Sequence, residues 1–101
     1  MNTETLQEFY QSLGFEEITV EDGYTAFFYE QSPEGMYALI TDEDGAMPQT
    51  LKQRIIFAAY SPEGAFRWST GFKNSYLLKE CWLTAQTPEE KFAAVENLLK
   101  A

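Results

Sequence analysis

Three consecutive carboxylates and a glycine, Asp42-Glu43-Asp44-Gly45, come closest in this chain to the spacing of a metal site. Calcium loops of the EF-hand type open in this way, but they also need a bidentate Glu at the twelfth position. Counted from Asp42, that position holds Gln53. We therefore interpret the segment as a solvated acidic turn, and we expect neither a metal nor another cofactor.

Four more carboxylates surround a short polar segment at residues 16–22. Paired carboxylates can act as acid and base where the surroundings shift their pKa values, but on a short polar strand and turn these would stay solvated. An acidic docking surface for a cationic protein is the better interpretation. The predicted surface comprises Glu16, Glu17, Glu21, Asp22, Asp42, Glu43 and Asp44.

The residue types that most often carry catalysis are scarce. The chain has no histidine, which removes the commonest general base and metal ligand. Its one cysteine, Cys81, stands between Glu80 and Trp82, whereas a reactive thiolate wants an electropositive setting. No glycine-rich phosphate loop is present. We therefore expect a non-enzymatic protein in which Cys81 lies in the core.

A short patch combines cations and aromatic rings: Arg67, Trp68, Phe72 and Lys73. Interleaved aromatics and cations can hold single-stranded nucleic acid, but the net charge of −9 opposes that use. Because Trp and Arg are enriched at protein-binding hot spots, we predict Trp68 and Phe72 as apolar contacts for a protein partner.

The charge is divided unevenly along the chain. Residues 1–51 hold eleven carboxylates and no Lys or Arg (−11), and residues 52–101 hold seven basic residues against five carboxylates (+2), which gives −9. Such a field attracts cationic partners and repels phosphates. No apolar run approaches the roughly 20 residues that span a bilayer, and residues 1–13 do not resemble a signal peptide. We expect a cytoplasmic protein that binds neither membranes nor nucleic acid.

Apolar spacing predicts a helix near each end of the chain. Leu6, Phe9, Tyr10 and Leu13 form one stripe over residues 4–13, and Gly14 follows where a left-handed C-cap needs glycine. Thr5 with Glu8, or else Asn2 or Thr3, offers the N-cap. The last helix is marked by a Thr N-cap and a first-turn proline in Thr87-Pro88-Glu89-Glu90.

Alternating, aromatic-rich runs predict the strands between these helices. Residues 51–60 fit both a strand and a helix; we favour a strand from about Arg54, and leave helix or strand open for residues 48–54. Asp22-Gly23 marks a hairpin, residues 42–49 a loop, and residues 71–74 a kink or turn. The other predicted strands are 16–20, 24–30, 36–41, 65–70 and 75–83.

The turn sequence Ser-Pro-Glu-Gly occurs twice, at residues 32–35 and 61–64, with an aromatic residue shortly before and after each copy. Proline presets the second turn position and glycine supplies a positive φ, which suits a hairpin with a type I turn and a glycine bulge. We favour convergent turn chemistry over an internal duplication, because nothing outside the turns matches well.

This order of elements predicts a single α+β domain over residues 1–101: an antiparallel β-meander of about five to six strands flanked by N-terminal and C-terminal helices. The strands are apolar on both faces, since Phe27 and Tyr29 oppose Ala26 and Phe28. Something must therefore cover the second face. Helices on opposite faces, a sheet that curls on itself, a bound ligand and a homodimer or other partner all remain open.

The segment Phe9-Tyr10-Gln11-Ser12-Leu13-Gly14-Phe15, followed by strands, resembles the helix-to-strand segment of glyoxalase-like proteins. Such modules begin with a strand before the helix and usually place His in their metal sites. This chain has neither, so no site residue is carried over. In size, acidity and element order the chain is also similar to type III secretion chaperones and toxin-immunity proteins, by analogy alone.

These observations lead to one principal hypothesis and two alternatives. The principal one is a small acidic protein-binding module of adaptor, inhibitor, immunity or chaperone type that docks a basic partner. The first alternative is a small-molecule binding domain that uses the aromatic face of a curved sheet. The second alternative is an enzyme. It ranks last because no convergent catalytic set is visible in the sequence.

Overall fold

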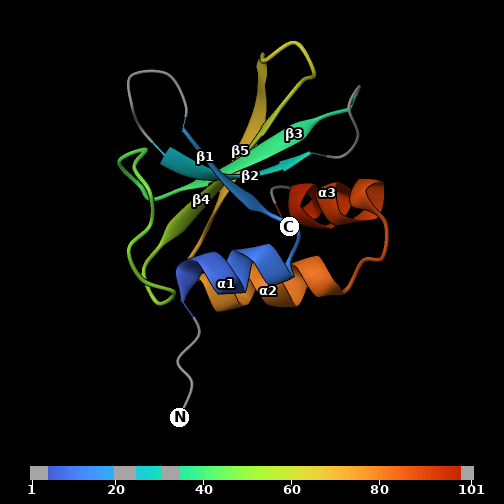
Figure 1. Cartoon of the computed structure of the whole chain (residues 1–101). Helices are drawn as coiled ribbons and strands as arrows, with labels where there is room; N and C mark the ends of the chain where they lie inside the picture. Colours follow the sequence, from blue (N-terminus) through green and yellow to red (C-terminus); the bar gives the residue numbers. More distant parts are fainter. Residues whose placement is uncertain (1–4, 20–24, 31–34, 99–101) are drawn as a thin grey trace.

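The structure is a computed structural model that describes residues 5–19, 25–30 and 35–98. A five-stranded antiparallel sheet in the order β1-β2-β3-β4-β5 follows one helix and precedes two (Figure 1). The predicted α+β class and the meander are confirmed. The elements are α1 (Leu6–Ser12), β1 (Glu16–Thr19), β2 (Thr25–Glu30), β3 (Tyr37–Thr41), β4 (Ile55–Tyr60), β5 (Phe66–Phe72), α2 (Ser75–Leu83) and α3 (Pro88–Asn97).

Helix α1 is bounded by local signals at both ends. Thr5 and Glu8 form a reciprocal capping box, in which each side chain accepts a hydrogen bond from the other residue's backbone N–H. At the other end Gly14 has φ +96°, the N–H of Gly14 donates to the carbonyl of Gln11, and that of Phe15 donates to the carbonyl of Tyr10. This is a Schellman motif, so both predicted caps are confirmed.

Residues 75–83 were predicted as the last strand, and this prediction is wrong because they form helix α2. Asn74 caps the helix by accepting a hydrogen bond from the backbone N–H of Leu77. Its buried residues are Ser75, Leu78 and Trp82, which recur with helical spacing. Helix α2 also carries apolar residues on its exposed side, Tyr76 and Leu77. Together with the buried residues they complete an alternating apolar pattern, and this pattern suggested a strand.

Helix α3 begins as its sequence predicts. Thr87 is the N-cap, its hydroxyl accepts from the backbone N–H of Glu90, and Pro88 occupies the first turn. Lys91 of α3 then reaches back to the end of α2, where its Nζ donates to the carbonyls of Trp82 at 2.8 Å and Ala85 at 3.0 Å. These bonds satisfy carbonyls that a helix end leaves unpaired, and they join the two helices.

The ambiguous segment at residues 51–60 contains a strand from Ile55, as favoured, and residues 48–54 form neither helix nor strand. Strand β5 runs through Phe72, two residues beyond its predicted end, so the kink expected from residue 71 begins later. The predicted hairpin turn Asp22-Gly23, and all but Gly35 of the first Ser-Pro-Glu-Gly copy, lie outside the described residues.

The second Ser-Pro-Glu-Gly copy forms the turn between β4 and β5. The N–H of Gly64 donates to the carbonyl of Ser61 at 2.9 Å, and Gly64 has φ +93°. This geometry matches the predicted turn with a glycine bulge. A second irregularity follows, because Ala59 pairs with Trp68 whereas Tyr60 pairs with Phe66. The extra residue, Arg67, places Phe66 and Trp68 on opposite faces of the sheet.

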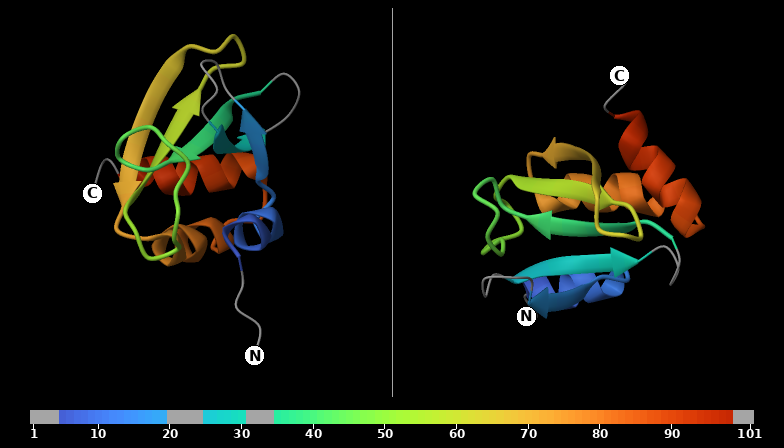
Figure 2. Two further views of the ribbon diagram at one scale, coloured as in Figure 1. Left: turned by 60° about the vertical axis from the view of Figure 1, so that its left-hand side comes forward. Right: turned by 90° about the horizontal axis from the view of Figure 1, so that it is seen from above.

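All three helices pack on the same face of the sheet (Figure 2). The ring of Tyr10 in α1 stacks on Phe27, with centroids 4.3 Å apart. Trp82 of α2 meets Tyr29 edge to face at 4.8 Å, and its indole N–H donates to the carbonyl of Leu13. Among the described residues, the hydrophobic core cluster therefore lies on the helix side of the sheet, which corrects the alternative that helices cover both faces.

Candidate functional site

The predicted acidic surface is divided in the structure. Glu16 and Glu17 are both exposed on β1 but point to opposite faces, since Glu16 pairs with Phe28 and Glu17 with Phe27. Glu21 and Asp22 lie outside the described residues. The expectation of one continuous carboxylate surface therefore rests on residues that occupy different faces of the sheet.

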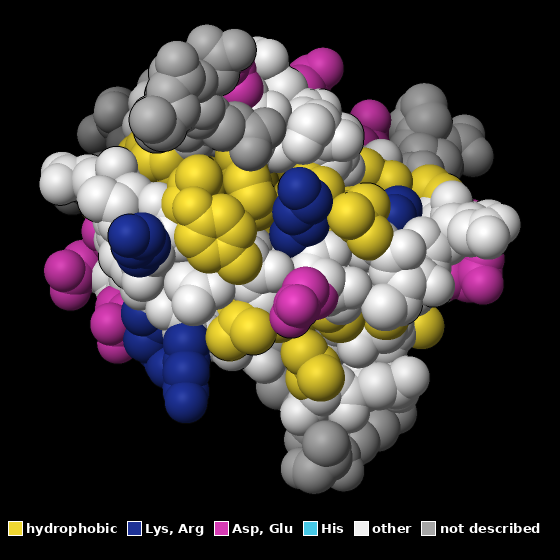
Figure 3. Space-filling view, turned by 90° about the horizontal axis from the view of Figure 1, so that it is seen from below, with side chains coloured by type: hydrophobic (Ala, Val, Ile, Leu, Met, Phe, Trp, Pro, Cys, Tyr) yellow, Lys and Arg dark blue, Asp and Glu magenta, His cyan; other side chains and the backbone are white. Residues whose placement is uncertain are grey.

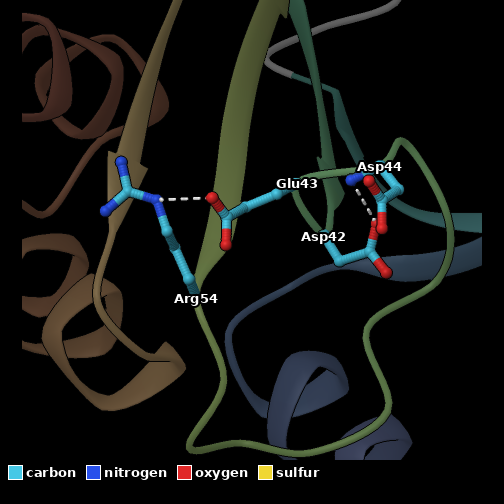
Figure 4. A network of polar contacts seen from close by, with 4 residues as sticks. All are labelled: Asp42, Glu43, Asp44 and Arg54. Atoms are coloured by element: carbon cyan, nitrogen blue, oxygen red, sulfur yellow. Dashed lines mark hydrogen bonds and ion pairs between the residues drawn. The ribbon is translucent and has the colours of Figure 1, made fainter.

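Two of the three carboxylates in the loop after β3, those of Asp42 and Glu43, have partners within the chain (Figure 4). Asp42 accepts from the backbone N–H groups of Asp44 at 2.8 Å and Ala46 at 2.9 Å, which fixes the turn. Glu43 faces Arg54, with Nε and Oε2 at 3.5 Å. In the described part of the chain, no group of three or more His, Cys, Asp or Glu side chains is arranged to hold a metal ion.

The two aromatic residues predicted as partner contacts have core positions. Phe72 is only 5% exposed and belongs to the hydrophobic core, so its ring is closed to a partner in this structure. Trp68 is half-buried and lies parallel to Phe57, with centroids 5.7 Å apart. Both project to the helix side of the sheet, because β5 pairs with β4 in a register that brings them there.

The groups with shifted pKa values are structural. Burial raises the pKa of the Tyr10 hydroxyl to about 12, although its hydrogen bond to Ser75 acts in the opposite direction. Burial also raises the pKa of the Cys81 thiol, which favours the unreactive protonated form. In both cases burial, and not a charged neighbour, is the main cause of the shift, so neither group indicates catalytic chemistry.

The other side of the sheet, which no described helix covers, carries apolar side chains such as those of Ile18, Phe28 and Leu39 together with polar ones such as Glu16 and Thr41; we call it the open face. A groove of about 840 Å³ crosses it along β3. Ile18 of β1 lines one part of the groove, and Glu63 and Gly64 of the β4–β5 turn line another. The remaining lining residues are Thr19, Ala26, Tyr37, Leu39, Thr41, Gly45 and Tyr60.

Four rings form an aromatic row on the open face, one from each of the strands β2 to β5. Phe28 lies 5.4 Å from Tyr37, Tyr37 stacks on Tyr60 at 5.2 Å with 11° between the planes, and Tyr60 meets Phe66 edge to face at 5.9 Å. Phe66 is 59% exposed. The other three rings are partly exposed, and a row of accessible aromatic rings is typical of a contact surface.

Three carboxylates share the open face with the aromatic row. Glu16 pairs with Phe28 and Glu30 pairs with Tyr37 in the strand register, and Glu63 lines the groove beside Tyr60. Among the described residues, neither Glu30 nor Glu63 forms an ion pair, and the lining of the groove contains no Lys or Arg. Apolar rings beside unpaired carboxylates suit a cation with an apolar surface.

Sequence reasoning noted the apolar second face and the aromatics around the repeated turn, but it missed the row. Tyr37 follows the first Ser-Pro-Glu-Gly copy, and Tyr60 and Phe66 flank the second. Because Tyr37 at the start of β3 pairs with Tyr60 at the end of β4, and Tyr60 pairs with Phe66 at the start of β5, the meander brings these rings together. The aromatic residues near the repeated turn sequence were visible in the sequence. Only the strand register shows that they lie side by side on one face.

A second hollow of about 670 Å³ lies on the opposite side of the molecule, between α1, residues 48–52 and Tyr76 of α2. That side shows hydrophobic side chains next to Lys and Arg (Figure 3). Helix α2 contributes three exposed large apolar residues, Tyr76, Leu77 and Leu83. The described residues that line this hollow include Lys52 and no Asp or Glu.

Comparison of the chain with known protein families, with curated proteins and with solved structures finds no match. The resemblance to glyoxalase-like proteins gains no support from these comparisons. In the described part of the chain, no helix has the length and apolar character needed to cross a bilayer.

Proposed function

We propose that this chain is a non-enzymatic protein-binding module that docks a basic partner on the open face. One observation carries the proposal: the aromatic row, the groove and the carboxylates Glu30 and Glu63, which form no ion pair among the described residues, lie together on the open face. An aromatic surface supplies apolar contact area, and carboxylates at its edge steer a cationic partner to it.

The overall charge supports the same choice. At a net charge of −9 the chain repels acidic partners at long range, and the open face adds carboxylates without a lining cation. The proposed site differs from the acidic surface predicted from sequence. It keeps Glu16, replaces the self-bonded Asp42 and ion-paired Glu43 by Glu30 and Glu63, and exchanges Trp68 for exposed Phe66.

A small-molecule binding domain is the second candidate. The groove volume of about 840 Å³ falls in the range of ligand pockets, and aromatic rings line it. The row continues beyond the groove to Phe28 and exposed Phe66, so a protein segment uses more of this surface than a small ligand. A ligand retained in native mass spectrometry of the purified chain would favour the second candidate.

The test is amide chemical-shift mapping of the ¹⁵N-labelled chain, titrated with a short peptide in which Lys alternates with Leu. We expect shifts on β2, β3 and β4, and weaker binding as salt rises, because surface charges are screened. The double variant Glu30→Lys/Glu63→Lys should lose most of the affinity, since both unpaired carboxylates become cations.

The matched control is Glu80→Lys/Glu96→Lys, which makes the same change in net charge on α2 and α3, on the helix side of the sheet. It should keep most of the affinity, whereas a general charge effect would weaken both variants equally. A peptide that alternates Glu with Leu should not bind. Shifts confined to the helix side, or equal losses in both double variants, would contradict the proposal.

A further inference from the structure

We infer that the aromatic row selects arginine side chains, so that the basic partner is an arginine-bearing segment. This inference rests on the proposed function and adds the identity of the cation.

Two of the chain's own cations already lie over aromatic rings on the helix side. The Lys79 ammonium is 5.4 Å from the centroid of Phe9, and the Lys91 ammonium is 5.4 Å from that of Trp82. No described Lys or Arg lies over a ring of the aromatic row, although the row contains four rings. The rings of the open face are thus free of the chain's own described cations and can take one from outside.

The shape of the row favours a flat cation. Tyr37 and Tyr60 lie almost parallel, at 11°, in neighbouring strands, and the edge-to-face ring of Phe66 follows them. A guanidinium is planar and weakly hydrated, so it stacks on such rings while its N–H groups stay available. An ammonium is compact and strongly hydrated, and it loses more hydration on the same surface.

The carboxylates lie where those N–H groups need acceptors. Glu30 is the strand partner of Tyr37, and Glu63 lines the groove together with Tyr37 and Tyr60. Both are exposed and without an ion pair among the described residues. A carboxylate accepts two parallel hydrogen bonds from a guanidinium, a geometry that lysine cannot match. Rings and carboxylates together therefore discriminate between the two cations.

The experiment compares three labelled peptides of one sequence by fluorescence anisotropy with the full chain. In the first every cation is Arg, in the second Lys, and in the third citrulline, which keeps the planar shape without the charge. We expect the Arg peptide to bind about two- to fivefold more tightly than the Lys peptide. The citrulline peptide should bind more weakly than either.

Tyr60→Leu removes a ring but retains apolar volume, and it should lower affinity for the Arg peptide by about two- to fivefold. It should affect the Lys peptide less. Phe66→Leu, at a site 59% exposed, gives a second variant whose fold is less at risk. Tyr76→Leu is the matched control, because Tyr76 is exposed on α2 and its loss should leave binding unchanged. Circular dichroism verifies that each variant is folded.

The outcomes separate the two proposals. Equal affinity for the Arg and Lys peptides, with both lost in Glu30→Lys/Glu63→Lys, overturns the arginine inference and leaves the proposed function standing. Citrulline binding as tight as Arg also overturns the inference, because stacking without charge would then suffice. Failure of all three peptides to bind the folded chain overturns both proposals. Arg preference that falls in Tyr60→Leu and Phe66→Leu, but not in Tyr76→Leu, supports the inference.

Discussion

At the scale of single residues, the core depends on polar groups that find partners inside it. The hydroxyls of Tyr10 and Ser75 are both fully buried and lie 2.6 Å apart, joining α1 to the start of α2. Among the described residues, no buried side-chain nitrogen or oxygen lacks a partner. Because an unpaired buried hydroxyl loses its hydration without compensation, such a pair is costly to break from one side.

Tyr10→Phe should lower the free energy of unfolding by about 1–2 kcal/mol at neutral pH, because it leaves the Ser75 hydroxyl unpaired. The variant should also change the pH profile. Burial raises the pKa of Tyr10 from 10.0 to about 12. The contribution of the protonated Tyr10 hydroxyl to the free energy of unfolding is therefore complete below pH 10 and is lost as the pH rises through 12. Urea denaturation of both proteins across this pH range measures the difference.

The control for this comparison is Tyr76→Phe, since Tyr76 is exposed and packs on Phe9 through its ring. It should change stability by less than about 0.5 kcal/mol. Wild type should lose stability more steeply than Tyr10→Phe above pH 10. Parallel pH profiles for the two proteins would show that Tyr10 does not stay protonated in the folded state.

At the scale of elements, local sequence signals predicted where helices begin and end more reliably than they predicted whether a segment is a helix or a strand. The capping box at Thr5, the glycine at position 14 and the Thr87-Pro88 start were all readable from sequence, because each acts within a few residues. Helix α2 was missed because its apolar residues fit two periods at once. Only the contacts of Leu78 and Trp82 with the core decide between them.

Gly14→Ala should destabilise the chain more than Gly45→Ala. Both glycines have positive φ, +96° and +83°, so each alanine incurs a backbone strain of about 1 kcal/mol. At Gly14 the new Cβ would also lie 3.0 Å from a ring carbon of Tyr29, whereas at Gly45 nothing lies within 4 Å. We expect an additional loss of about 1 kcal/mol for Gly14→Ala.

The measurement is urea denaturation of the two variants and wild type under the same conditions. Since Gly45→Ala isolates the backbone strain, the difference between the variants reports the contact with Tyr29. Equal losses would mean that Tyr29 moves aside without cost. A larger loss for Gly45→Ala would contradict the description of the two turns.

At the scale of the whole molecule, the sequence predicted the net charge but not how the fold distributes the carboxylates over the surface. Seven of the eleven carboxylates of residues 1–51 were predicted to form one docking surface, yet the fold divides Glu16 from Glu17 and engages Asp42 in its own turn. What long-range pairing created instead was the aromatic row, from residues as distant as Phe28 and Phe66. Such a surface depends on strand register, which one sequence specifies only through the complete fold.

The unbalanced charge should also affect stability. At about 0.01 M salt the Debye length is roughly 30 Å and at 0.15 M roughly 8 Å, while the radius of gyration is 12.8 Å. Repulsion among charges that sum to −9 therefore extends across the molecule only at low salt. We expect sodium chloride to raise the free energy of unfolding by about 1 kcal/mol over this range, measured by urea denaturation.

The variant Glu16→Lys/Glu17→Lys reduces the net charge to −9 + 4 = −5. It should be more stable than wild type at low salt, and its free energy of unfolding should depend less on the salt concentration, because the long-range repulsion is smaller. A salt dependence equal to that of wild type would show that the repulsion is local.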